Sequence, residues 1–143
     1  MYSRARRFAA LAAALLFATA IAAPAVAADK KSGVVIQMSD ADPAKWNLAL
    51  NNAKNIQTDL GKDNTDVEIV AYGPGIGMLK FDSEVGNRLD EAKKAGVKIT
   101  ACQNTMRAQK LAEKDMHPSI GYVPSGVVQI MKRQNEGWAY IRP

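Results

Sequence analysis

The chain has very few of the side chains on which metal sites and nucleophilic enzymes usually depend. Among its 143 residues there is one cysteine, Cys102, and one histidine, His117. One cysteine cannot form a disulfide within its own chain, and one Cys with one His cannot complete a structural zinc site. No Ser-His-Asp arrangement is indicated by order or by motif. We therefore expect neither a metal ion nor a cofactor.

Aromatic residues are also scarce, at 6% of the chain, and they do not alternate with basic residues. The sequence has no block of Lys and Arg, so it lacks the pattern of a nucleic-acid-binding protein. The glycine-rich stretch "GPGIG" at 73–77 lacks the Gly-Lys-Ser/Thr ending of a P-loop and the order of a dinucleotide fingerprint. We expect it to be a tight turn.

The first 28 residues have the layout of a secretory signal peptide. Three arginines precede an uncharged, Ala- and Leu-rich run over 8–21, and small residues allow cleavage after Ala27 or Ala28. The run is short and Ala-rich for a membrane span, although an uncleaved anchor is the alternative. We expect a periplasmic or secreted protein with no stable membrane span after cleavage.

The rest of the chain, residues 29–143, is long enough for one domain with its own core. Of the 19 basic residues, three are the signal arginines, which leaves 16 against 14 acidic residues and a net charge of +2. The basic character of the whole chain is thus largely a targeting feature.

Hydrophobic patterning over this domain alternates between strands and helices. Short apolar runs predict strands, and three- to four-residue apolar spacing with caps predicts helices. The predicted strands are 33–39, 67–72, 97–102, 120–123 and 138–143; the predicted helices are 42–61, 83–96, 104–112 and 126–137. Helix-length crossovers between strands predict an α/β fold, with a mostly parallel sheet covered by helices on both faces.

The patterning also predicts which side chains face the core. In the first helix, capped by Asp42 and begun by Pro43, these are Trp46, Leu50, Ala53, Ile56 and Leu60; in the last, they are Val127, Ile130 and Met131. Ser83 is the expected cap of the second helix. The dispersed methionines, Met38, Met78, Met106 and Met131, are expected to fill the core and not to bind copper.

Chemistry in such a fold collects at the carboxyl ends of the strands. Three stretches reach that edge: the glycine loop at 73–77, Cys102 and the turn 124–126. Cys102 also precedes a helix, whose free N–H groups would favour the thiolate, the nucleophilic form. The alternative is that Cys102 is a buried apolar spacer at the end of its strand.

His117 lies beside Pro118, in a predicted loop before the fourth strand. It would act as a base toward Cys102 only if that loop folded back over the thiol. The alternative is a surface histidine without a catalytic role.

The segments "VEIVAYGPGIGML", "AGVKITACQNTM" and "GYVPSGVVQIMKRQNEGWAYIRP" together resemble the DsrE-like (DsrE/DsrF-like) family of small sulfur-relay proteins, in its exported single-domain branch. The resemblance spans nearly the whole predicted domain. It implies a three-layer α/β/α fold with a five-stranded, largely parallel sheet. It also implies homo-oligomers, commonly trimers or hexamers, with sites near the subunit contacts.

The resemblance further implies that Cys102 is a thiol that accepts sulfur as a persulfide and passes it on. Gly73, Gly75, Asn104 and Gly126 are then the candidate substrate-binding residues. Well-characterised relay members work in the cytosol, so an exported member would need a different donor, such as thiosulfate, sulfide or another exported thiol protein. The competing hypothesis is a non-catalytic oligomeric module that binds a small ligand or a protein.

Overall fold

Five strands form one sheet in the order β4-β3-β2-β1-β5, and each neighbouring pair is parallel. The computed structural model describes residues 31–143, so the predicted signal peptide lies outside the described residues and stays a prediction. The strands are β1 (Ser32–Met38), β2 (Thr65–Ala71), β3 (Lys98–Cys102), β4 (Gly121–Val123) and β5 (Ala139–Ile141). The expected five-stranded sheet is confirmed, and it is parallel throughout.

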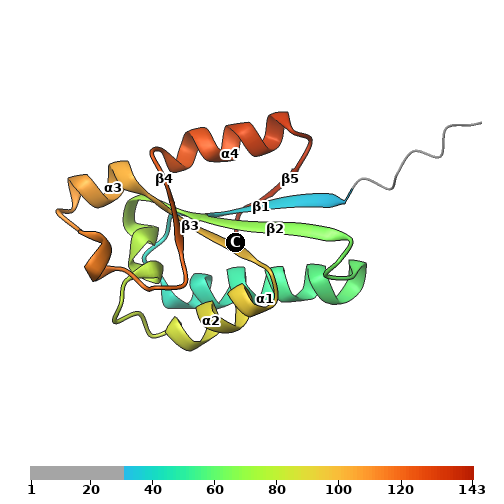
Figure 1. Cartoon of the computed structure of the whole chain (residues 1–143), viewed down its shortest axis with the longest axis horizontal. Coiled ribbons are helices and arrows are strands. Elements are labelled where there is room, and N and C mark those ends of the chain that lie inside the picture. The colour runs from blue at the N-terminus through green and yellow to red at the C-terminus, as the bar shows by residue number, and fades with distance from the viewer. Residues whose placement is uncertain (1–30) are drawn as a thin grey trace, which may run out of the picture.

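Helices cover both faces of the sheet, which gives the three layers that the pattern predicts (Figure 1). The helices are α1 (Pro43–Leu60), α2 (Gly86–Lys94), α3 (Gln103–Ala108) and α4 (Gly126–Asn135), with short 3-10 segments η1 (Gly73–Leu79) and η2 (Glu113–Asp115). Figure 1 shows α1 and α2 on one face and α4 alone on the other. No helix among residues 31–143 is long and apolar enough to cross a membrane.

The two layers of core differ greatly in size. The larger core lies between the sheet and α1, α2 and η1, and it contains fully buried side chains from all these elements, including Ile36, Ile69, Met78 and Leu89. The smaller core, beneath α4, consists of Val35, Val70 and Ile130, with Tyr72 and Trp138 packed against it. Helix α4 is therefore held on the sheet by little apolar surface.

Helix α1 begins and ends where local signals place it. The Asp42 carboxylate accepts a hydrogen bond from Ala44 N at 2.8 Å, Pro43 occupies the first turn, and Gly61 ends the helix at a φ of 86°. The inward stripe holds for Trp46, Leu50 and Ala53, but Leu60 is exposed because it lies at the end of the helix, beyond the sheet.

Other local expectations are wrong. The glycine stretch after β2 is not an irregular loop but the 3-10 segment η1, and α2 begins after Val85, with Ser83 in the preceding turn. In α4 only Ile130 of the three predicted inward residues is buried, whereas Val127 and Met131 are exposed. A single helix on this face has no neighbouring helix to cover its flanks.

Candidate functional site

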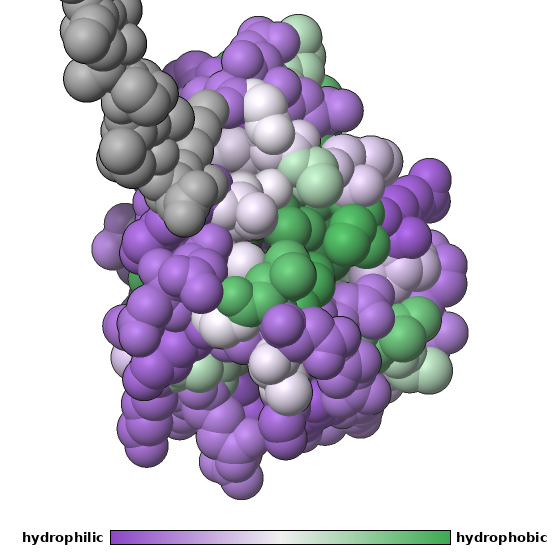
Figure 2. All heavy atoms as spheres, turned by 90° about the vertical axis from the view of Figure 1, so that its right-hand side faces the viewer, coloured by the Kyte–Doolittle hydropathy of each residue, from purple (hydrophilic) through white to green (hydrophobic). Residues whose placement is uncertain are grey.

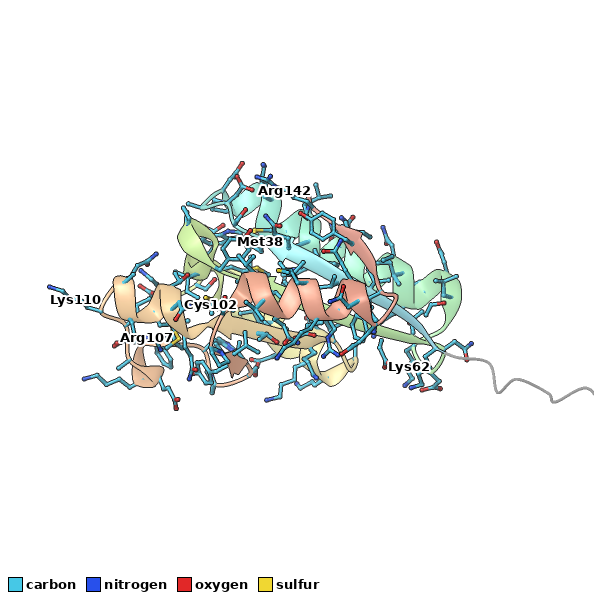
Figure 3. All side chains as sticks on the ribbon, turned by 90° about the horizontal axis from the view of Figure 1, so that it is seen from above. Met38, Lys62, Cys102, Arg107, Lys110 and Arg142 are labelled. Atoms are coloured by element: carbon cyan, nitrogen blue, oxygen red, sulfur yellow. The ribbon has the colours of Figure 1, made fainter. Side chains whose placement is uncertain are left out.

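The carboxyl ends of β2, β3 and β4 meet at one edge of the sheet and lead directly into η1, α3 and α4. Cys102 is both the last residue of β3 and the N-cap of α3. Figure 3 shows Cys102 at the place where α3 meets the start of α4, with Arg107 and Lys110 further along the chain from it. The predicted strand-end position of the thiol is therefore present.

The backbone N–H groups of Gly126, Thr105 and Asn104 are the groups that act on the pKa of the Cys102 thiol. The Cys102 side chain makes no capping hydrogen bond to α3. Burial raises the pKa of the Cys102 thiol, but hydrogen bonds from Gly126 N–H, from Thr105 N–H and hydroxyl, and from Asn104 N–H together bring the pKa below its ordinary value. Among residues 31–143, no cation is needed to account for this lower pKa, which favours the thiolate.

Thr105 connects this thiol to the glycine segment. Its Oγ1 accepts a hydrogen bond from Gly73 N at 2.9 Å, and Gln109 Nε2 donates to Gly73 O at 3.2 Å. Asn104 N donates to Pro124 O at 3.1 Å, which connects α3 to the turn before α4. The three stretches predicted to meet at this edge are therefore joined by hydrogen bonds.

Gly126 is the predicted site residue that lies closest to the thiol. A Cβ at this position would come within 3.2 Å of the Cβ atoms of both Cys102 and Tyr72. Because these contacts leave little room for a side chain, glycine allows the backbone N–H of residue 126 to approach the sulfur.

The other predicted site residues lie less directly at the sulfur. Gly75 is buried, and a Cβ there would be 2.3 Å from Met38 O, so this glycine packs η1 against the end of β1. The Asn104 side chain is exposed and accepts a hydrogen bond from Arg107. Only the backbone of Asn104 faces the thiol.

His117 is buried and packs against Gly86 at the start of α2. Its backbone N–H donates to Leu79 O at 2.8 Å. In the ring, Nδ1 accepts from Ser119 N at 3.2 Å, and Nε2 lies 3.9 Å from the Asp90 carboxylate. The His117 ring therefore connects the segment before β4 to α2. It is not among the groups around Cys102. No cluster of His, Cys, Asp or Glu that would bind a metal occurs within residues 31–143.

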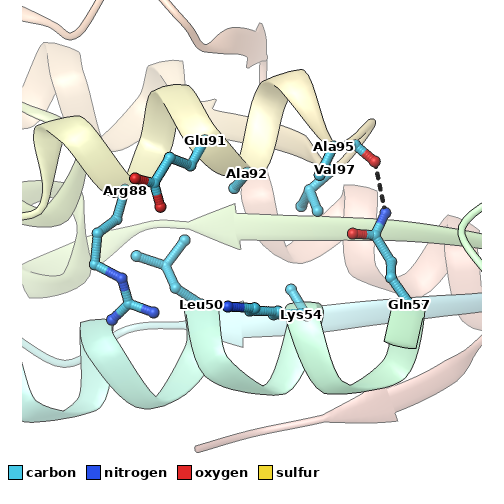
Figure 4. Close-up of a pocket in the computed structure, with 9 residues that line it drawn as sticks. Leu50, Lys54, Gln57, Arg88, Glu91, Ala92, Ala95 and Val97 are labelled. Carbon is cyan, nitrogen blue, oxygen red and sulfur yellow. Dashed lines mark hydrogen bonds between the residues drawn. The ribbon is translucent and has the colours of Figure 1, made fainter. Parts of the chain in front are cut away.

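Access to the sulfur is narrow, since Cys102 is 5% exposed. Two hollows lie elsewhere. One, of about 170 Å³, is a groove between α1 and α2 lined by Leu50, Lys54, Arg88 and Glu91 among others (Figure 4). The other lies between α1 and β5, with Ile56, Leu60 and Ile141 in its lining. Figure 2 shows apolar side chains grouped on an otherwise largely hydrophilic end of the molecule.

A buried polar group beside the site was not predicted from the sequence. Glu68 is fully buried on the α4 side of β2 and is bonded to Thr100, Gln129 and Arg133. A glutamate within the apolar run "VEIVAY" is the signal that would have revealed it, because a carboxylate buried in a strand needs partners from elsewhere in the fold.

A five-stranded parallel sheet with helices on both faces and a cysteine at the carboxyl end of its third strand places this protein among the small three-layer α/β proteins. The chain belongs to the DsrE/DsrF-like family, whose profile matches residues 30–143. Family membership suggests a role related to sulfur relay.

Solved structures agree with this assignment. A protein of unknown function, MTH1491 from Methanobacterium thermoautotrophicum, is 37% identical, with a TM-score of 0.75 over 79% of this chain and 100% of that one. Protein BT1422 from Bacteroides thetaiotaomicron (15% identity, TM-score 0.65, 78% and 95% covered) and the ychN protein from E. coli (9%, 0.63, 80% and 99%) share the fold. No curated protein matches the chain.

Proposed function

We propose that this protein carries sulfane sulfur as a persulfide on Cys102. The supporting observation is the set of amide N–H groups from Gly126, Thr105 and Asn104 that lowers the pKa of the thiol despite its burial. The thiolate is the form that accepts sulfur. The family assignment supports the same class of role.

The transfer needs no acid–base pair in the protein. The Cys102 thiolate attacks the outer sulfur of a donor persulfide, the S–S bond of the donor breaks, and its electron pair leaves with the donor as a thiolate. The products are a Cys102 persulfide and a donor thiol, so no oxidant is consumed. The persulfide then passes its outer sulfur to an acceptor thiolate by the same exchange.

The narrow access favours a donor that presents its sulfur at the end of a slender group. With Cys102 only 5% exposed, the donor must approach where α3 and α4 meet. If the chain is exported through residues 1–28, this donor is a persulfide or thiosulfate outside the cytosol.

Intact-mass measurement tests the proposal. After incubation with a small-molecule persulfide, the wild-type protein should gain the mass of one sulfur atom, and a reductant should remove it. A Cys102→Ser variant, matched in size, should gain none. A wild-type protein that gains no sulfur while a free thiol peptide in the same solution does would contradict the proposal.

We further propose that the protein works as a homo-oligomer, a trimer or a hexamer. The supporting observation is that α4 exposes Val127, Val128 and Met131, at 50%, 46% and 56%, directly after the residue that contacts Cys102. An apolar patch of this kind is typical of a contact surface.

A further inference from the structure

Glu68 is a buried charge that the sulfur chemistry does not use. Its side chain is fully buried in the middle of the sheet, where an unpaired carboxylate would be strongly disfavoured. Both of its oxygens are bonded: Oε1 accepts from Thr100 Oγ1 at 2.8 Å and from Gln129 Nε2 at 3.1 Å, and Oε2 accepts from Gln129 Nε2 at 3.1 Å and Arg133 Nε at 2.5 Å.

The partners of Glu68 belong to the two elements that also meet at the thiol. Thr100 lies in β3, two residues before Cys102, so both side chains point to the α4 face of the sheet. Gln129 and Arg133 lie in α4, about one and two turns after Gly126. One carboxylate therefore fixes α4 relative to β3 a short distance below the contact between Gly126 and Cys102.

This fixation matters because apolar packing holds α4 weakly. The only buried apolar side chain of the helix is Ile130, against Val35 and Val70. Arg133 is itself restrained by Glu136 at 2.9 Å and by the Trp138 ring, whose centroid lies 4.3 Å away. Partial burial alone would lower the pKa of Arg133, but its bonds to Glu136 and Glu68 raise it, so the guanidinium stays charged.

We propose that Glu68 is a positioning residue that sets the register of α4 on the sheet and thereby holds the Gly126 N–H against the Cys102 sulfur. The inference deepens the proposed sulfur-carrier function and rests on it. Among the donors around Cys102, Thr105 and Asn104 follow in the same short segment, whereas Gly126 arrives from a separate helix. The position of Gly126 therefore depends on what anchors α4.

A through-space effect of Glu68 would have the opposite sign. Removing a negative charge near a thiol favours the thiolate and lowers the thiol pKa. Loss of the α4 anchor withdraws a hydrogen bond from the thiolate and raises the thiol pKa. The direction in which the thiol pKa changes thus distinguishes a positioning role of Glu68 from a through-space effect of its charge.

The test is the pH dependence of Cys102 alkylation by iodoacetamide in full-length wild-type protein and in Glu68→Gln. We expect the titration midpoint of Glu68→Gln to rise, with alkylation at neutral pH slowed up to about tenfold, which corresponds to one pKa unit. Glu136→Gln removes the same charge from the exposed partner of Arg133 and should leave the midpoint unchanged. An unchanged or lower midpoint in a folded Glu68→Gln variant overturns the inference.

Gln129→Leu covers the case in which Glu68→Gln does not fold. It keeps the ion pair between Glu68 and Arg133, changes no charge, and removes both hydrogen bonds from Gln129 to the carboxylate. We expect a smaller rise of the midpoint, and no change would overturn the inference. Because both measurements compare thiol midpoints, they decide the role of Glu68 even if the wild-type protein accepts no sulfur.

Discussion

At the scale of single residues, the character of Cys102 depends on two opposed influences. Burial disfavours the charged sulfur, while hydrogen bonds from three backbone amides and one hydroxyl favour it, and the hydrogen bonds together prevail. A cysteine with the same burial among aliphatic side chains would have a raised pKa and would be inert. The amides, more than the exposure of the sulfur, distinguish this residue from a packing cysteine.

The titration of Cys102 in the folded protein tests this balance. We expect alkylation to proceed without denaturant, with a midpoint below the usual thiol pKa of about 8.5. In guanidinium chloride the midpoint should return to that usual value. A thiol that reacts only after unfolding would instead indicate a packing cysteine and would favour the non-catalytic binding module.

The same shift has a consequence for stability. Since the folded-state pKa of Cys102 is the lower one, the thiolate stabilises the folded protein fully above the unfolded thiol pKa. This contribution is lost as the pH falls through the folded-state pKa. The free energy of unfolding of wild type relative to Cys102→Ser should therefore increase from neutral to alkaline pH, measured by urea denaturation.

At the scale of elements, η1 illustrates a glycine required for close approach. The segment turns over the end of β1, where Gly75 lies against the backbone of Met38. The side chains of Ile76, Met78 and Leu79 are buried in the core. This anchors Gly73, which bonds to Thr105 beside the thiol. The glycines thus support the site through packing.

A Gly75→Ala substitution should destabilise the fold. The added Cβ would lie 2.3 Å from Met38 O, so backbone must move, and we expect a loss of about 2 kcal/mol in the free energy of unfolding. Gly121→Ala is the matched control, because its nearest atom is Ile99 O at 3.8 Å, and it should change stability by less than about 0.5 kcal/mol. Equal stability of the two variants in urea denaturation would contradict the packing role of Gly75.

The elements also differ in how far sequence alone could predict them. The ends of α1 depend on signals next to it, Asp42, Pro43 and Gly61, and these were predictable. The exposure of Val127 and Met131 on α4 was not predictable, because apolar spacing indicates a helix but does not show how many helices cover a face of the sheet. The burial of Glu68 was not predicted for a related reason: the residues that bond to its carboxylate are 32 to 65 residues away in the chain.

At the scale of the whole molecule, the candidate site is assembled from segments that are distant in sequence. Gly73, Cys102 and Gly126 lie at or just after the carboxyl ends of three different strands, and the parallel sheet brings these ends to one edge. The apolar residues of α4 begin at Val127, immediately after the glycine at the sulfur. A subunit contact over α4 would therefore lie next to the route by which a donor reaches Cys102.

Substitution on α4 tests whether this surface joins subunits. If it does, Met131→Lys should place a charge in the contact and shift the protein toward monomers, measured by sedimentation velocity over a range of concentrations. Asn55→Lys adds the same charge at an exposed position of α1, on the opposite face of the sheet, and should leave the assembly of the wild type unchanged. A wild-type protein that is monomeric throughout, or a Met131→Lys variant that assembles as the wild type does, would mean that α4 faces solvent or a different partner.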